Sequence, residues 1–103
     1  MPARMGAGSV HHIAFRAEND QAQAAMVAKL AEHHRIRATE QVDRNYFRSV
    51  YFREPGGILF EIATDEPGFA VDEAAAELGR SLKLPPALEA RRDEIEAVLP
   101  DLA

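Results

Sequence analysis

Two residues in apolar, extended stretches of this sequence, His12 and Glu61, carry side chains that bind metal ions. Glu61 lies in the middle of the apolar run 58–63, where a buried carboxylate is costly unless it is paired or bound to a metal ion. An imidazole with a carboxylate, and without a thiolate, suits non-haem Fe(II) or Mn(II), and also Zn(II). The alternatives are a Glu on a solvated strand face and a His in a structural hydrogen bond.

A non-haem iron site of the two-His, one-carboxylate type needs a second His. The other His residues of the chain are His11, His33 and His34. His33 and His34 fall at the end of a predicted helix, where the helix dipole favours a cation, and they lie away from His12. The spacing of the residues therefore supplies two ligands of such a triad and leaves the third open.

His11, Arg44 and Tyr51 are further candidates for a role in chemistry. The hydroxyl of Tyr51 is able to donate a hydrogen bond to a bound oxygen ligand. The alternatives are a Tyr at the core edge with its hydroxyl in water, and an Arg in a solvated turn.

The apolar pattern predicts the element order β-α-β-β-β for the first two thirds of the chain. The predicted strands lie at 9–16, 36–42, 46–53 and 58–63, and the helix at about 19–34. Side chains alternate along a strand, so His12 lies opposite Ile13 and Phe15, which mark the expected core face. Glu61 lies opposite Phe60 and the other large apolar residues of its strand. His12 and Glu61 therefore converge if the first and last strands are neighbours in the sheet.

The last third of the chain is acidic and rich in Ala, and its pattern predicts two helices, at 72–78 and 87–99. Leu88, Ile95 and Leu99 form one apolar stripe on the second of these. We expect a module at 1–65 that binds the metal and a helical C-terminal extension at 66–103. Apolar surface on an open sheet and along this stripe favours a homodimer or higher oligomer.

The composition limits the classes of function that remain. With 103 residues the chain has the size of one domain, and it has no Cys, so disulfides and thiolate metal sites are excluded. The formal net charge of -5 argues against a nucleic-acid binder. The sequence shows neither a membrane span nor a signal peptide, so we expect no membrane partner and a cytoplasmic location.

Three segments of the sequence resemble a known family. They are 10–16 (VHHIAFR), 43–47 (DRNYF) and 49–65 (SVYFREPGGILFEIATD), and the tail from 67 to 86 is similar as well. They resemble the C-terminal part of ring-cleaving dioxygenases of the vicinal oxygen chelate superfamily. Within that superfamily the resemblance is to the hydroquinone-type extradiol enzymes, whose relatives are described as glyoxalase or bleomycin-resistance proteins.

This resemblance implies an α+β fold, the βαβββ module that forms half of a cupped barrel. It implies Fe(II) bound by His12 and Glu61, with Mn(II) and Zn(II) as alternative metals. His11, Arg44 and Tyr51 match positions that orient the substrate and stabilise negative charge on oxygen in this family. The implied substrates are an aromatic diol and O2, which the metal brings together while the ring is opened by insertion of oxygen.

The resemblance also reveals a departure, because the family members are much longer and take their first His ligand from an N-terminal module. Three explanations follow: a C-terminal fragment of a longer enzyme, a half-site completed by dimerisation, or a non-catalytic module that binds or sequesters a small molecule, as bleomycin-resistance proteins do. A glyoxalase-like isomerase or hydrolase with another divalent metal is a further alternative.

Overall fold

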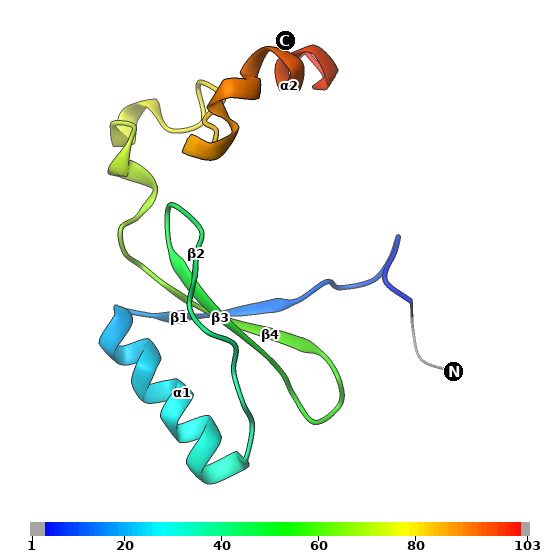
Figure 1. Ribbon diagram of the computed structural model, residues 1–103, viewed down its shortest axis with the longest axis vertical. Helices are drawn as coiled ribbons and strands as arrows, with labels where there is room; N and C mark the ends of the chain where they lie inside the picture. Colours follow the sequence, from blue (N-terminus) through cyan, green and yellow to red (C-terminus); the bar gives the residue numbers. More distant parts are fainter. Residues whose placement is uncertain (1–3, 102–103) are drawn as a thin grey trace.

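Four strands form one mixed sheet, which one α-helix covers on a single face (Figure 1). The computed structural model describes residues 4–101. Its elements are β1 (Ile13–Ala17), α1 (Asp20–His34), β2 (Val42–Asp43), β3 (Arg48–Arg53) and β4 (Leu59–Thr64), followed by 3-10 turns at Phe69–Val71, Ala75–Glu77 and Pro86–Arg91 and by α2 (Arg92–Val98). The β-α-β-β-β order and the α+β class predicted from the sequence are confirmed.

The strand order in the sheet is β1-β4-β3-β2, so the first and last strands in the chain are neighbours. β1 pairs with β4 in parallel, and the other two pairs are antiparallel. A parallel pair needs a long crossover connection, which here runs through α1, β2 and β3. The register sets Ala14 of β1 and Tyr51 of β3 on either side of Glu61.

Helix α1 is capped at both ends. The side chain of Asn19 accepts a hydrogen bond of 2.8 Å from the backbone N–H of Ala22, and Arg35 ends the helix in the left-handed region at φ 55°. The apolar stripe of α1 packs on the core formed by Ala17, Val50, Phe52 and Ile62. The predicted helix at 19–34 is therefore confirmed, and the opposite face of the sheet is left without a helix.

Gln23 links α1 to two strands from inside this interface. Its side chain is 2% exposed, and its amide nitrogen donates to the backbone carbonyls of Arg48, at 3.0 Å, and Ile62, at 2.8 Å. Its amide oxygen accepts a hydrogen bond from the side chain of Gln41 at 2.8 Å. A buried amide with its bonding capacity used in this way fixes how the helix sits on the sheet.

Two of the predicted strands differ from those in the structure. Ile13 and Phe15 lie on the face towards α1 as expected, yet they are 42% and 44% exposed, because β1 is an edge strand. The predicted strand 36–42 is reduced to β2. Thr39 lies beside Tyr51, but its side-chain oxygen takes the N–H of Tyr51 at 3.0 Å, where a ladder would use a backbone carbonyl. This side-chain hydrogen bond interrupts the regular backbone pairing of the segment with β3.

The predicted helix at 72–78 is wrong, and only the 3-10 turn Ala75–Glu77 forms there. Asp72, the first residue of that predicted helix, accepts a hydrogen bond from the hydroxyl of Tyr46 at 3.0 Å. A helix this short is marginal without packing to support it. The predicted helix at 87–99 is confirmed in part, since it starts as a 3-10 turn and becomes α-helical in α2.

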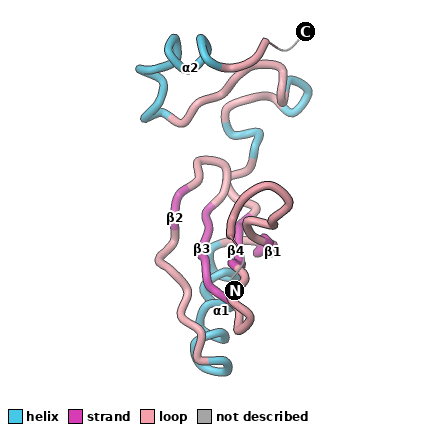
Figure 2. The backbone as a smooth tube through the Cα atoms, turned by 90° about the vertical axis from the view of Figure 1, so that its right-hand side faces the viewer, coloured by secondary structure: helices cyan, strands magenta, loops and turns pink. Residues whose placement is uncertain are grey.

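The C-terminal segment extends away from the sheet (Figure 2). The radius of gyration is 17.1 Å, whereas about 13 Å is typical of a compact domain of about 100 residues. The apolar stripe expected in this segment is exposed at Leu88 and Leu99. Among residues 4–101, no helix is long and apolar enough to cross a membrane.

Glu54 organises the turn between β3 and β4. Its carboxylate accepts hydrogen bonds from the backbone N–H groups of Gly56, at 2.8 Å, and Ile58, at 2.6 Å, which lower its pKa below the ordinary value. Gly57 takes φ 91°, a conformation that favours glycine. This turn fixes the register of the hairpin that carries Glu61.

We expect the substitution Gln23→Met to lower the free energy of unfolding by about 1–3 kcal/mol, because it leaves two carbonyls and Gln41 without their partner. Urea denaturation followed by circular dichroism measures the change. Gln21→Met, at an exposed position on the same helix, is the matched control and leaves the midpoint nearly unchanged. An equal effect of the two substitutions would contradict the assigned role of Gln23.

A second prediction concerns acid stability. Because the pKa of Glu54 is lowered in the folded state, its contribution is complete above the ordinary value of 4.5 and is lost as the pH falls through the folded value. The difference in melting temperature between the wild type and Glu54→Gln should therefore be largest at neutral pH and narrow below about pH 4.5. Glu40→Gln, at an exposed position, is the matched control for the loss of one surface carboxylate.

Candidate active site

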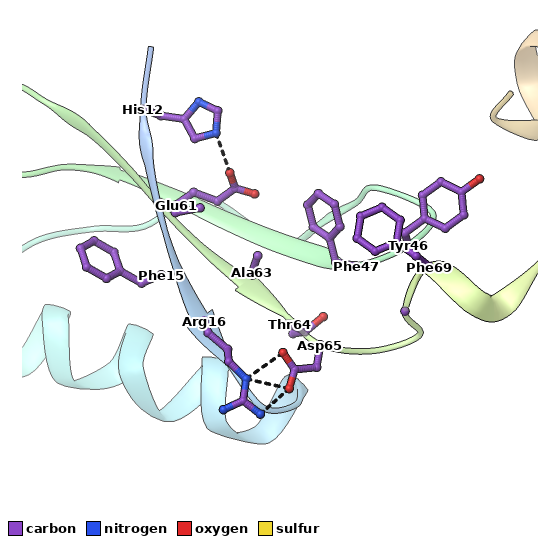
Figure 3. A pocket seen from close by; sticks show the side chains of 12 residues that line it. His12, Phe15, Arg16, Tyr46, Phe47, Glu61, Ala63, Thr64, Asp65 and Phe69 are labelled. Carbon is purple, nitrogen blue, oxygen red and sulfur yellow. Dashed lines mark hydrogen bonds and ion pairs between the residues drawn. The ribbon is translucent and has the colours of Figure 1, made fainter. Parts of the chain in front are cut away.

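The candidate site lies on the face of the sheet that α1 leaves uncovered. Glu61 occupies the middle of this face, on the strand between β1 and β3. Strand alternation adds Ala14 from β1, and Ser49 and Tyr51 from β3, to the same face. His12 lies one residue before β1, not inside it as predicted, and it still projects over this face (Figure 3).

His12 and Glu61 meet, as the sequence predicts for neighbouring first and last strands. Nε2 of His12 lies 3.0 Å from Oε1 of Glu61 (Figure 3). The Glu61 side chain is 5% exposed and that of His12 is 38% exposed, so the carboxylate is buried while the imidazole borders open space. Whether the pair binds a metal stays a prediction.

Two hydroxyl groups hold the other oxygen of Glu61. The side-chain hydroxyl of Ser49 donates to Oε2, and the Tyr51 hydroxyl lies 3.4 Å from the same oxygen. Ser49 is fully buried and was not among the candidate residues. Its position two residues before Tyr51, hence on the same strand face, is the signal that identifies it.

His11 and Arg44 do not contact Glu61 directly, and each is hydrogen-bonded to a residue that does. Nδ1 of His11 lies 2.9 Å from Nδ1 of His12, and the two rings meet edge to face with centroids 5.1 Å apart. The guanidinium of Arg44 donates through Nε to the Tyr51 hydroxyl at 3.0 Å and lies over the Tyr51 ring. The structure thus joins all five predicted residues into one hydrogen-bonded group, with Glu61 at its centre.

A cavity of about 580 Å³ opens beside this group. One wall is aromatic, formed by Tyr46 and Phe47 of the segment before β3 and by Phe69 of the segment after β4 (Figure 3). Tyr46 and Phe69 stack with centroids 5.2 Å apart. The backbone N–H of Gly68 donates to the carbonyl of Tyr46 at 2.8 Å, which ties the two segments together.

The ion pair of Arg16 with Asp65 and the hydrogen bond of Tyr46 to Asp72 involve residues that line the cavity. Arg16 binds both oxygens of Asp65 through Nε, at 2.9 and 2.8 Å, and lowers the pKa of that carboxyl. Burial and the hydrogen bond to the carboxylate of Asp72 raise the pKa of Tyr46 above its ordinary value. Spacing alone could not show that this aromatic wall comes from two distant segments.

The donor set of this centre matches part of a metal site. One imidazole nitrogen and one buried carboxylate oxygen face each other, and Nδ1 of the same imidazole contacts Nδ1 of His11, which orients the ring. Within residues 4–101, no group of three or more His, Cys, Asp or Glu side chains forms a metal cluster. His34 borders a separate groove on the α1 side, with Phe15 and Met26. The described residues therefore bring two candidate ligands, His12 and Glu61, together at this centre.

Residues 1–62 match the family model described as the glyoxalase/bleomycin resistance protein/dioxygenase superfamily. A solved structure of a "putative dioxygenase" from Bacillus subtilis superposes with a TM-score of 0.87 at 49% identity, over 96% of this chain and 32% of that one. Among curated relatives, the "Putative ring-cleaving dioxygenase MhqE" of Bacillus subtilis is 58% identical over 94% of this chain. The chlorohydroquinone/hydroquinone 1,2-dioxygenase of Sphingobium indicum is 37% identical over the same share.

The chain spans about a third of the length of these relatives, 31% of the first and 30% of the second. The family match covers more than half of the chain, and the solved structure shares its fold over nearly all of it. The resemblance and the module fold inferred from the sequence are confirmed. The chain belongs to the glyoxalase/bleomycin resistance protein/dioxygenase superfamily.

Proposed function

We propose that this chain supplies the metal-binding half of the active site of an Fe(II)-dependent dioxygenase that cleaves hydroquinones and related aromatic diols. The observation that carries the proposal is the contact of His12 with the buried carboxylate of Glu61, at the edge of a cavity with an aromatic wall. The printed names of the relatives, ring-cleaving and hydroquinone dioxygenases, support the substrate class.

In this proposal His12 and Glu61 hold the metal, and Fe(II) supplies a centre that binds the diol and O2 together and passes electrons between them. His11 fixes the ring of His12, so that Nε2 faces the cavity side. Mn(II) and Zn(II) fit the same donors and are alternative metals.

The remaining residues bind and orient the diol. The aromatic wall receives the planar ring by stacking or edge contact. The guanidinium of Arg44 and the hydroxyl of Tyr51 already form a hydrogen-bonded pair, and both groups donate to oxygen. They therefore stabilise negative charge on a substrate oxygen.

We propose that the third protein ligand comes from outside this chain, either from a further module of a longer polypeptide or from a second copy. In both cases residues 1–65 are the metal-binding module. Residues 66–103 are then an extension whose first part, around Phe69, completes the wall of the cavity.

A non-catalytic binding module is the second candidate, and the observation that favours it is the pair of ligands where a triad needs three. Such a module would bind a hydroquinone in the absence of metal, and the binding would persist with a chelator present. The dioxygenase proposal requires instead that chelation abolishes O2 consumption.

Substitution Glu61→Ala is expected to abolish Fe(II) binding, because it removes the only carboxylate that faces His12 among the described residues. Anaerobic loading followed by iron analysis measures binding, and an oxygen electrode with a substituted hydroquinone measures turnover. Glu40→Gln, at an exposed position, is the matched control and should retain both. Unchanged iron affinity in Glu61→Ala would refute the assigned metal site.

Substitution Phe69→Ala is expected to weaken hydroquinone binding about twofold to tenfold, the effect of losing one aromatic contact of about 0.5–1.5 kcal/mol. Calorimetric titration with the substrate under anaerobic conditions measures the change. Val71→Ala, two residues along and outside the cavity lining, should leave the affinity unchanged. Equal affinities of Phe69→Ala and the wild type would remove this wall from the substrate site.

A further inference from the structure

Ser49 is the most deeply buried side chain of the site face, although no helix covers that face. Its exposed fraction is 0%, and its hydroxyl donates to Oε2 of Glu61. Its register partner on β4 is Ala63, whose small side chain leaves room beside the carboxylate. The Ser49 hydroxyl has Glu61 as its hydrogen-bond partner, and Ser49 itself does not line the cavity.

The two oxygens of Glu61 have different surroundings. Oε2 lies against the hydroxyls of Ser49 and Tyr51, whereas Oε1 faces His12 at 3.0 Å. A carboxylate that rotates about its last bond exchanges its oxygens freely unless one of them is held. The hydroxyl contacts therefore fix the orientation of the carboxylate group, in which one of two equivalent oxygens is turned towards the imidazole.

Tyr51 is the weaker of the two restraints on Oε2. Its contact with Oε2 is long, at 3.4 Å, and its hydroxyl also accepts a hydrogen bond from Arg44. Ser49 has no such second partner among the hydrogen bonds of the described residues. The dominant restraint on the carboxylate is therefore the serine.

We infer that Ser49 is a positioning residue, which holds Oε2 of Glu61 and thereby presents Oε1 to a metal shared with His12. This inference rests on the proposed function and adds to it a residue that touches neither the metal nor the substrate. Partners of this kind usually contribute about tenfold to a hundredfold to metal affinity.

The first experiment measures Mn(II) affinity by counting free Mn(II) with electron paramagnetic resonance in titrations of the full chain. Ser49→Ala should weaken binding about tenfold to a hundredfold. Ser49→Thr, which keeps the hydroxyl, should restore most of the affinity. Tyr51→Phe should weaken Mn(II) binding less than Ser49→Ala, because its contact with Oε2 is longer.

Gln23→Met is the control for a merely structural effect, because Gln23 is equally buried but bonds to the backbone on the α1 side of the sheet. It should destabilise the fold and leave Mn(II) affinity unchanged. If Ser49→Ala lowers the affinity no more than Gln23→Met does, Ser49 only fills space and the inference is overturned.

The second experiment needs no metal and separates this inference from the proposed function. The urea midpoints of Ser49→Ala, Glu61→Met and the double variant form a cycle. The inference predicts that the urea midpoint of the double variant falls by clearly less than the sum of the decreases in the two single variants. The reason is that either substitution alone already breaks the Ser49–Glu61 hydrogen bond. Additive losses would overturn the inference. If the wild-type chain binds no Mn(II) while the losses are non-additive, the proposed metal site fails, and the contact that positions Glu61 stands.

Discussion

The parallel pairing of β1 with β4 is the constraint on which the rest of the site depends. It joins the N-terminal and C-terminal strands of the module and sets Ala14 beside Glu61. His12, two residues earlier on the same face, then reaches the carboxylate. Without this pair, the imidazole and the carboxylate would belong to separate parts of the chain. The crossover through α1 makes the pairing possible and covers the opposite face, so that one face is packed and the other can receive a ligand.

A buried carboxylate on the open face then determines much of the local chemistry. Burial without partners would be costly, and this chain supplies hydroxyls on one oxygen and an imidazole on the other. Arg44 and His11 extend the group outward, since each bonds to a residue that contacts Glu61. The hydrogen-bonded group is thus complete in itself, while the cavity beside it stays available to a planar ligand.

The element order along the chain and the position of the helix could be predicted from the sequence because their signals are local, whereas the pairing of the first and last strands entered only as a condition. Alternation placed His12 and Glu61 on one face, and the apolar pattern placed the helix at about 19–34, where α1 begins with Asn19 as its cap. The segments that the sequence misjudged depend on contacts that it does not display. Asp72 accepts a hydrogen bond from Tyr46, which lies in a distant segment of the chain, and no α-helix forms at 72–78. The side chain of Thr39 takes the place of a backbone carbonyl in the strand pairing. The aromatic wall was missed for the same reason, since Phe69 reaches Tyr46 only after β4 is in place. Strand alternation places Ser49 on the same face as Tyr51, but a serine side chain by itself did not indicate a role in the site.

The site combines contacts between residues that are close in the sequence with contacts between residues that are far apart in it. Ser49 and Tyr51 are 12 and 10 residues from Glu61, within one hairpin closed by a tight turn. The β1–β4 pairing instead joins residues far apart, as in the Arg16–Asp65 ion pair with its separation of 49. Closing a long loop costs more chain entropy than closing a hairpin, and non-local pairings form more slowly. The carboxylate and its hydroxyl partners therefore belong to a locally encoded hairpin, whereas the imidazole is brought to them by a non-local pairing with a larger entropy cost.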